Sequence, residues 1–238
     1  MTTFLPPPAP PALPAATLTT ARTVLRPWRA EDLAPFAALN ADREVMRHFP
    51  TTLDRAQSDA VAHRLAQHIE AHGYGPWALE IPGVTPFAGF VGLMNVSFDA
   101  PFAPAVEIGW RLARAWWSNG YATEAAQAAV AFAFDTLGLD TLVSFTVTAN
   151  ARSRAVMARL GMHHCPDEDF LHPLAPPGTS HAPSRALPAG GERLACIDVG
   201  RIGAVARSFT HLTLPTIWSE HFSRCASSAL AIATAFTA

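Results

Sequence analysis

The segment from Ala105 to Leu137 constrains the fold more than any other part of the chain. Residues 105–112 (AVEIGWRL) alternate between apolar side chains and polar or small ones, which predicts a half-buried strand. Residues 121–137 are rich in alanine and are followed by Gly138, which predicts a helix that ends there. Only Ala113–Gly120 separates the two, so a strand leads through one tight turn into a helix.

This turn has the properties of an anion-binding site. Its last residues, Gly120-Tyr121-Ala122, run into the helix, so backbone N–H groups and the positive end of the helix dipole face one point. Such a point binds phosphate groups. The segment contains neither GK[ST] nor GxGxxG, which excludes those two nucleotide-binding motifs here. An ordinary helix start is the alternative interpretation.

Strands and helices alternate in the rest of the chain. The residue pattern predicts strands over 22–28, 76–81, 87–96 and 141–147. It predicts helices over 30–40, 53–72 and 151–160. In the second helix, Asp54 is the expected N-cap and Gly73 the expected end. This order of elements predicts an α/β or α+β domain.

Composition excludes several classes of protein. Half of the residues are apolar and 15% are charged, which favours a sizeable core over disorder. No apolar run reaches the roughly 18 residues of a membrane-spanning helix. Three cysteines without a CxxC motif suggest a reducing cytoplasm. Residues 1–179 carry 12 arginines and 16 acidic residues, a net charge of −4, which argues against nucleic acid and for a cationic substrate.

Several blocks in a fixed order resemble the GNAT superfamily of acetyl-CoA-dependent N-acetyltransferases. The resemblance is to the branch that contains the ribosomal-protein N-terminal acetyltransferases of the RimJ and RimL type. The blocks are TARTVLRPWRAED (20–32), EVMRHFP (44–50), GPWALE (75–80), EIGWRL (107–112), WWSNGYATEAA (116–126) and NARSRAVMARLGM (150–162). The resemblance implies the GNAT acyl-CoA acyltransferase fold over residues 18–178. That fold is a central, mixed, mostly antiparallel twisted sheet flanked by helices.

The resemblance also implies an acetyl-CoA site. The family's pyrophosphate loop, Q/R-x-x-G-x-G/A, falls on Trp117–Ala122, where Gly120 and Ala122 match and Trp117 replaces the usual Gln or Arg. The loop therefore lacks a side-chain cation, and we expect backbone amides with Arg114 or its neighbours to hold the phosphates. Backbone N–H groups of a splayed, bulged strand at 108–112 are expected to polarise the thioester carbonyl. The residues expected to contact acetyl-CoA are Trp110, Arg111, Leu112, Trp117, Ser118, Asn119, Gly120, Tyr121, Ala122 and Asn150.

Two residues are candidates for proton transfer. Most amines are protonated at pH 7, because the pKa of an unperturbed lysine is about 10.4, so a base must act before the amine attacks. Glu107 is the candidate base, with a cross-strand charge pair or a clamp on the substrate ammonium as alternatives. Ser153 is the candidate acid for the leaving thiolate, with an ordinary first-turn helix serine as the alternative. Asn150 also suits the N-cap of the following helix, a role compatible with cofactor contact.

The expected activity is acetyl transfer to a primary amine, either a protein N-terminus or a small molecule. The alternative is a GNAT-fold module that binds acyl-CoA without turnover. No metal is expected: His68 and His72 have the i, i+4 spacing of a metal site, but no third ligand is evident. We expect neither nucleic acid nor a membrane as partner, and the oligomeric state is not readable from the sequence.

The two ends of the chain differ from the domain. Residues 1–17 form a proline-rich leader, expected to be mobile, and without the basic region of a secretory signal. Residues 179–238 form an atypical tail. Codons that encode Ser184–Ala189 are compatible, one base out of frame, with the closing strand HVLYRL of related proteins, and THLTLPTI (210–217) resembles a translated sequencing adaptor. We therefore interpret the tail as a frameshift product or as disordered, and predict a sheet without its last strand; a genuine extension is the alternative.

Overall fold

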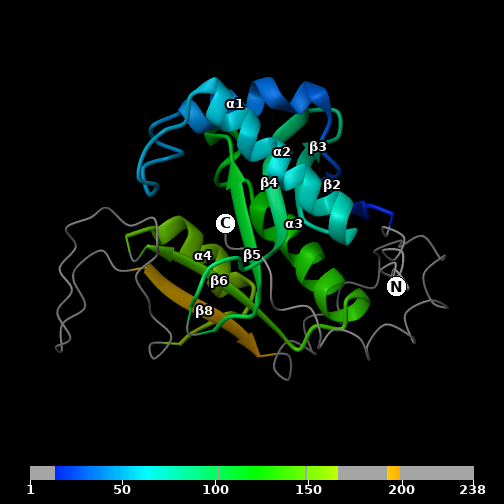
Figure 1. The fold of residues 1–238 in the computed structure, drawn as a ribbon, viewed down its shortest axis with the longest axis vertical. Coiled ribbons are helices and arrows are strands. Elements are labelled where there is room, and N and C mark those ends of the chain that lie inside the picture. The colour runs from blue at the N-terminus through cyan, green and yellow to red at the C-terminus, as the bar shows by residue number, and fades with distance from the viewer. Residues whose placement is uncertain (1–13, 101, 148, 166–191, 199–238) are drawn as a thin grey trace, which may run out of the picture.

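The computed structural model describes residues 14–100, 102–147 and 149–165, together with the backbone of 192–198 (Figure 1). Eight strands form one sheet in the order β1-β2-β3-β4-β5-β6-β8-β7. The parallel pair is β5 with β6, and the other neighbours are antiparallel, as predicted for a mixed, mostly antiparallel sheet. The strands are β1 (Leu18–Thr19), β2 (Val24–Arg26), β3 (Pro76–Ile81), β4 (Thr85–Asn95), β5 (Val106–Leu112), β6 (Thr141–Val147), β7 (His163–His164) and β8 (Glu192–Asp198).

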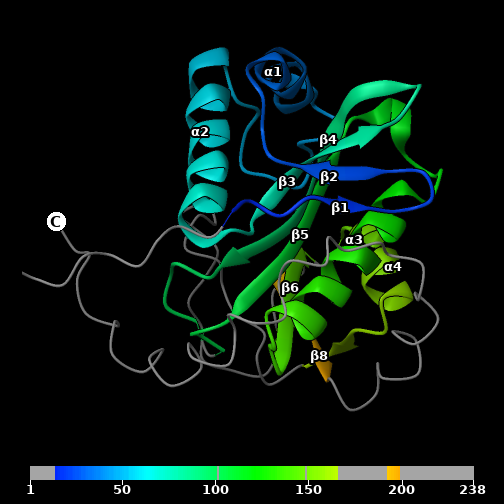
Figure 2. The same cartoon turned by 90° about the vertical axis from the view of Figure 1, so that its right-hand side faces the viewer.

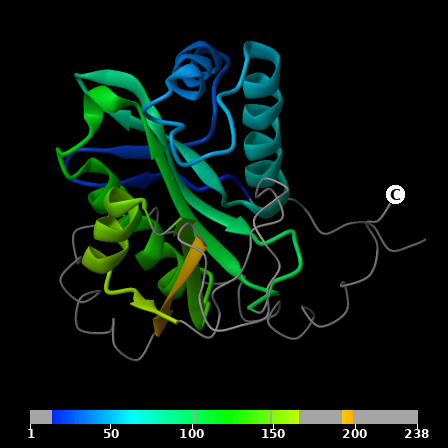
Figure 3. The same ribbon diagram turned by 90° about the vertical axis from the view of Figure 1, so that its left-hand side faces the viewer.

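Helices cover both faces of this sheet. Figures 2 and 3 show α1 and α2 on one face and α3 on the other. Asp54 caps α2 by accepting a hydrogen bond from the Gln57 amide, and Gly73 ends it with φ of 75°, so both predicted ends are confirmed. The helices are α1 (Leu33–Ala41), α2 (Arg55–His72), α3 (Tyr121–Ala131) and α4 (Ala151–Arg159). Shorter helical segments are η1 (Ala30–Asp32), η2 (Arg114–Trp116) and the π-helical η3 (Phe132–Thr136), which continues α3. None of the described helices is both long and apolar enough to cross a membrane.

The two faces of the sheet are buried in two separate cores. Towards α3, the core contains Trp77, Leu93 and Ile108, all fully buried. Towards α1 and α2, it contains Phe36 and Ala78, also fully buried, with other apolar side chains of the two helices. The predicted alternation of β5 is what divides its side chains between the two faces.

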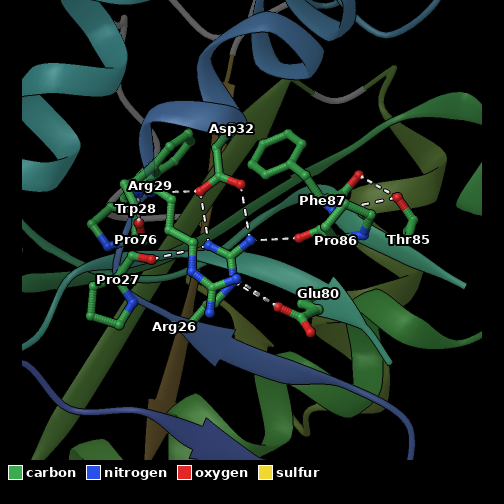
Figure 4. Close-up of polar contacts among 10 residues, drawn as sticks. All are labelled: Arg26, Pro27, Trp28, Arg29, Asp32, Pro76, Glu80, Thr85, Pro86 and Phe87. Atoms are coloured by element: carbon green, nitrogen blue, oxygen red, sulfur yellow. Dashed lines mark hydrogen bonds and ion pairs between the residues drawn. The ribbon is translucent and has the colours of Figure 1, made fainter. Parts of the chain in front are cut away.

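A buried arginine joins β2 to its neighbours (Figure 4). The Arg26 side chain is 4% exposed, and its two terminal nitrogens donate to both carboxylate oxygens of Asp32 at 2.8 and 2.9 Å. Its Nε donates to Glu80 at 2.8 Å, and its remaining hydrogens reach the carbonyl oxygens of Pro27 and Pro86. The charge is therefore neutralised by two carboxylates and its donors are satisfied, so this cluster serves the fold.

The prediction that the sheet lacks its last strand is wrong. All seven residues of β6 pair with β8, which comes from the segment that we assigned to the tail. The physical reason is that Leu142 and Val143 of β6 are buried, so an unpaired β6 edge would leave backbone donors and acceptors without partners beside the core. The rest of the tail, 179–191 and 199–238, and the leader up to residue 13 lie outside the described residues.

Candidate active site

The turn between β5 and α3 forms an exposed backbone cradle. Ser118 and Gly120 have φ of 61° and 83°, and these residues and Asn119 between them are exposed. Alternation of left-handed and extended or right-handed residues directs successive amides to one side, and α3 adds its positive N-terminal end at Tyr121. A Cβ on Gly120 would lie 3.3 Å from the Arg22 guanidinium, so glycine suits this position for both its conformation and its small size. The residues fit the pyrophosphate loop that the sequence predicted.

Arg22 brings to this loop the cation that its own sequence lacks. The guanidinium donates to the carbonyl oxygen of Asn119 at 3.1 Å and to the Glu124 carboxylate at 2.6 Å, and it lies 4.9 Å from the centre of the Tyr121 ring. Burial would raise the pKa of Glu124, but hydrogen bonds from Thr20 and Arg22 lower it. Sequence analysis missed Arg22 because it precedes the loop by almost a hundred residues, although it lies in the first block of the family resemblance.

Trp117, which replaces the usual Gln or Arg, anchors the loop to its neighbours. Its indole Nε1 donates to the carbonyl oxygen of Leu112 at 2.8 Å, which ties the loop to the end of β5. Arg152 of α4 stacks on its ring at 4.4 Å and bonds Glu44 at 3.3 Å. The Asn119 side chain donates to the Trp117 carbonyl oxygen at 2.9 Å. The structure therefore brings α4, the loop and the segment before α2 together at this point.

Beside this loop, β5 and β6 separate. Their register contains the single pair Glu107–Val143, beyond which residues 108–112 have no strand partner on this side in the described structure. The splayed strand is therefore confirmed. The bulge is not: β4 and β5 pair without interruption from Gly89–Leu112 to Asn95–Val106, and the irregularity of this region lies between β3 and β4. The free edge of β5 is therefore the edge on the side of β6, since the edge towards β4 is paired along its whole length.

Glu107 and Arg111 lie on the face of β5 that is directed towards α1 and α2. Arg111 is in contact with the ring of Phe90, which belongs to the core on that face. Trp110, in contrast, packs against the α3-side core, and Leu112 is buried in it. The side chains of Arg111 and Trp110 therefore lie on opposite faces of β5, and the contact of Arg111 with acetyl-CoA stays a prediction. The Glu107 carboxylate extends over Gly109, with Oε1 3.5 Å from the position of a Cβ there.

Asn150 and Ser153 form one hydrogen-bonded unit at the start of α4. The Asn150 Oδ1 accepts from the backbone N–H of Ser153 at 3.2 Å, so Asn150 is the N-cap, as expected. A backbone N–H is always a donor, which fixes the amide orientation; Nδ2 therefore donates to the Ser153 hydroxyl and to Thr146, both at 3.0 Å. Because the Ser153 oxygen accepts from Asn150, its own hydrogen is available for another acceptor.

In the part of the chain that the structure describes, no three His, Cys, Asp or Glu side chains gather as a metal site. His68 and His72 instead stack on each other, with ring centroids 4.3 Å apart, and both meet the ring of Tyr74 edge-on. Burial, and to a lesser degree His72, lower the pKa of His68 to about 4. This cluster closes the end of α2.

The chain is similar in sequence to two known proteins. The chain is 31% identical over 169 residues to the FsC-acetyl coenzyme A-N(2)-transacetylase of Aspergillus fumigatus, covering 68% of this chain and 71% of that protein. It is 28% identical over 148 residues to the uncharacterized protein YkkB of Bacillus subtilis, covering 62% and 85%.

Solved structures share the fold. An acetyltransferase from Agrobacterium tumefaciens is 26% identical with a TM-score of 0.55, over 82% of this chain and 97% of that one. RimJ of Mycobacterium smegmatis in complex with CoA-disulfide is 20% identical with a TM-score of 0.61, over 79% and 90%. The family model described as acetyltransferase (GNAT) domain matches residues 22–163. The chain therefore belongs to the GNAT family of acetyl-CoA-dependent acetyltransferases.

Proposed function

We propose that the chain transfers an acetyl group from acetyl-CoA to a primary amine, which attacks the thioester directly while both substrates are bound. The observation that carries this proposal is the cradle at Ser118–Gly120, which adjoins both the start of α3 and the free edge of β5. The relative named as an N(2)-transacetylase supports a nitrogen atom as the acceptor. The acidic charge of residues 1–179 supports a cationic substrate.

The chain's own residues divide the binding work. Amides of the loop and of the first turn of α3 receive the pyrophosphate, while Arg22 and Glu124 hold the loop in shape. Bound acetyl-CoA supplies an activated acetyl group. The free backbone edge of residues 108–112, including Trp110 and Leu112, donates to the thioester carbonyl oxygen, where negative charge develops.

Proton transfer is assigned to two side chains. Glu107 accepts a proton from the substrate ammonium, and the neutral nitrogen then bonds to the carbonyl carbon as the C–S bond breaks. The sulfur leaves as a thiolate and takes the hydroxyl proton of Ser153, which solvent restores; the second amine proton passes to solvent. The hydrogen bond from Asn150 to the Ser153 oxygen favours this role, because it leaves the hydroxyl hydrogen free to point elsewhere.

Substitution of Gly120 tests the cofactor site. Gly120→Ala should weaken acetyl-CoA binding at least tenfold by calorimetry, since a Cβ there strains the backbone and crowds Arg22. Gly83→Ala is the matched control, because Gly83 has φ of 74°, with no described atom within 4 Å of a Cβ, and lies in the β3–β4 turn. Equal affinity in the two variants would contradict the loop assignment.

Substitution of Glu107 tests the chemistry. Release of CoASH from acetyl-CoA is followed with a panel of primary amines. Glu107→Gln should lower kcat by about 10²–10⁴-fold with the Kd for acetyl-CoA unchanged. A kcat that is unchanged across pH 6–9 would remove Glu107 as the base. Tight acetyl-CoA binding without CoASH release for any amine would overturn the proposal in favour of a non-catalytic acyl-CoA-binding module.

A further inference from the structure

We propose that Arg111 binds a carboxylate of the acceptor, so that the acceptor is a primary amine that also carries a carboxylate group. This inference rests on the proposed acetyl transfer and names the substrate class for that site. It follows from three features of the described structure: a cation without an acidic partner, a fixed position, and a second charged side chain on the same face of β5.

Arg111 is a partly exposed cation that has no acidic partner among the described residues. Its single hydrogen bond among the described residues runs from one terminal nitrogen to Asn40 Oδ1, at 2.7 Å. Its Nε is buried and has no partner, and no described carboxylate lies within 4.0 Å of the guanidinium. A guanidinium has five N–H donors, so most of its binding capacity is unused. Burial lowers the pKa of Arg111 to about 10, which still leaves it protonated at neutral pH.

Such a charge is costly to keep. Removing an ion from water costs several kcal/mol unless an opposite charge and hydrogen bonds compensate for the loss. An arginine needed only to fill space would be replaced by an apolar side chain with a gain in stability. A ligand that brings a carboxylate to Arg111 supplies the missing counter-charge, and a carboxylate matches the planar fork of a guanidinium.

The guanidinium is held in a fixed position. Asn40, which accepts its hydrogen bond, donates in turn to Ser58 at 2.9 Å, and both of these residues are fully buried. This chain links β5 to α1 and then to α2. The ring of Phe49 lies 4.1 Å from the guanidinium carbon and is 43% exposed. The cation therefore lies directly beneath a surface aromatic ring, with its orientation already set.

Arg111 and the proposed base lie on the same face of one strand. Glu107 and Arg111 lie on one face of β5 with Gly109 between them. Apart from its chain neighbours, the only described atom within 4 Å of a Cβ at Gly109 would be Glu107 Oε1. An acceptor whose carboxylate meets Arg111 extends along this face of β5 towards Glu107.

A matched pair of substrate series tests this inference. The kcat/KM of the full chain is measured for ω-amino acids and for n-alkylamines of equal chain length. We expect the ω-amino acid of best-fitting length to exceed its alkylamine at least tenfold. In Arg111→Met this preference should disappear, because only the ω-amino acid loses an ionic contact; the readout is the ratio of the two kcat/KM values. Arg64→Met, which removes an exposed arginine of α2, is the control and should keep the preference.

The other results of this experiment distinguish failure of the inference from failure of the proposed function. Absence of a carboxylate preference in the unsubstituted protein, with CoASH released from alkylamines, overturns the inference and leaves acetyl transfer intact. An equal loss for both series in Arg111→Met assigns Arg111 to the fold and also overturns it. Where Arg111→Met does not fold, Arg111→Lys keeps the charge but not the planar fork, and a smaller ratio of the ω-amino acid kcat/KM to the alkylamine kcat/KM supports the inference. No CoASH with any amine is instead the failure of the proposed function.

Discussion

Arg26 and Arg111 lie on strands of the same sheet, and their surroundings are opposite. Arg26 meets two carboxylates and two carbonyl oxygens, whereas Arg111 meets one amide oxygen and two aromatic rings. The hydrogen bond with Asp32 is the largest cause of a raised pKa for Arg26, and burial lowers the pKa of Arg111. The charge of Arg26 is neutralised by carboxylates of the same chain, whereas the charge of Arg111 has no such partner among the described residues.

The presence or absence of counter-ions in the same chain distinguishes an arginine that stabilises the fold from one that binds a ligand. A buried arginine that stabilises a fold is accompanied by its counter-ions in the same chain, since their absence costs several kcal/mol. An arginine without them, beside a proposed reaction centre, indicates a ligand that carries the opposite charge. Substitutions at Arg111 and at the partners of Arg26 test this comparison.

The largest effect is expected at the paired arginine. Asp32→Ala should lower the free energy of unfolding by about 3–5 kcal/mol in urea, because it leaves the Arg26 charge buried with half of its partners. Glu80→Ala is the matched control, since Glu80 is 26% exposed and Asp32 remains; its expected cost is about 1 kcal/mol. Equal losses of unfolding free energy in the two variants would contradict the view that Asp32 is the main counter-ion of Arg26.

At the unpaired arginine the expected effect on stability is much smaller. Arg111→Met removes an uncompensated charge, which is favourable, and deprives Asn40 of its donor, which costs about 1–3 kcal/mol. These terms oppose each other, so the free energy of unfolding should stay within about 1 kcal/mol of its original value. A decrease in the free energy of unfolding as large as that of Asp32→Ala would mean that Arg111, like Arg26, stabilises the fold.

Arg22 lies between the two extremes, being half exposed and paired with Glu124. Arg22→Ala should change the free energy of unfolding by less than about 1 kcal/mol, as is usual for surface ion pairs. Its Kd for acetyl-CoA should rise about tenfold, equivalent to about 1.4 kcal/mol, because the cradle loses its support. Arg29→Ala, at an exposed arginine paired with Glu80 away from the loop, should leave that Kd unchanged. Calorimetric titration of both variants with acetyl-CoA measures the two Kd values, and equal values would contradict the role of Arg22 in supporting the loop.

The smallest expected effect is on the pH dependence of stability, and it comes from His68, whose imidazole is neutral in the folded protein. Because burial lowers the pKa of His68 from 6.5 to about 4, the folded state binds fewer protons than the unfolded state between these values. Stability should therefore fall as the pH decreases from 6.5 towards 4. His68→Phe should flatten this part of the Tm–pH curve, whereas the same change at exposed His63 should not. Identical curves for the two variants would contradict the assignment.

Local pattern was sufficient for most of the fold. The bounds of β3 and β6 agree with their predicted ranges, and both ends of α2 were readable from Asp54 and Gly73. The predicted helix at 121–137 divides into α3 and the π-helical η3, because apolar periodicity does not distinguish i+4 from i+5 hydrogen bonds. The two-residue strands β1 and β7 and the distant β8 carry too little local pattern to be found.

The candidate site was predictable in part. The loop and the N-cap at Asn150 follow from residues adjacent in sequence, and the structure places both as expected. Arg22 and the environment of Arg111 depend on contacts between segments that are far apart in the chain, and no spacing rule predicts them. The alternation of β5 did place Arg111 opposite Trp110, but it gave no information on whether an acid would meet the guanidinium.

In the proposed function, the contact of Arg22 with the loop makes the affinity for acetyl-CoA depend on one edge of the sheet. Arg22 follows the two-residue strand β1, and its partner in the loop is Asn119. Short edge strands are among the first elements to open in the native state. Each such opening withdraws Arg22 and loosens the cradle, so a bound cosubstrate must slow amide hydrogen exchange at 18–26 as well as at the loop itself. The N-terminal hairpin is thus thermodynamically part of the proposed binding site, although we assign it no contact with the cosubstrate.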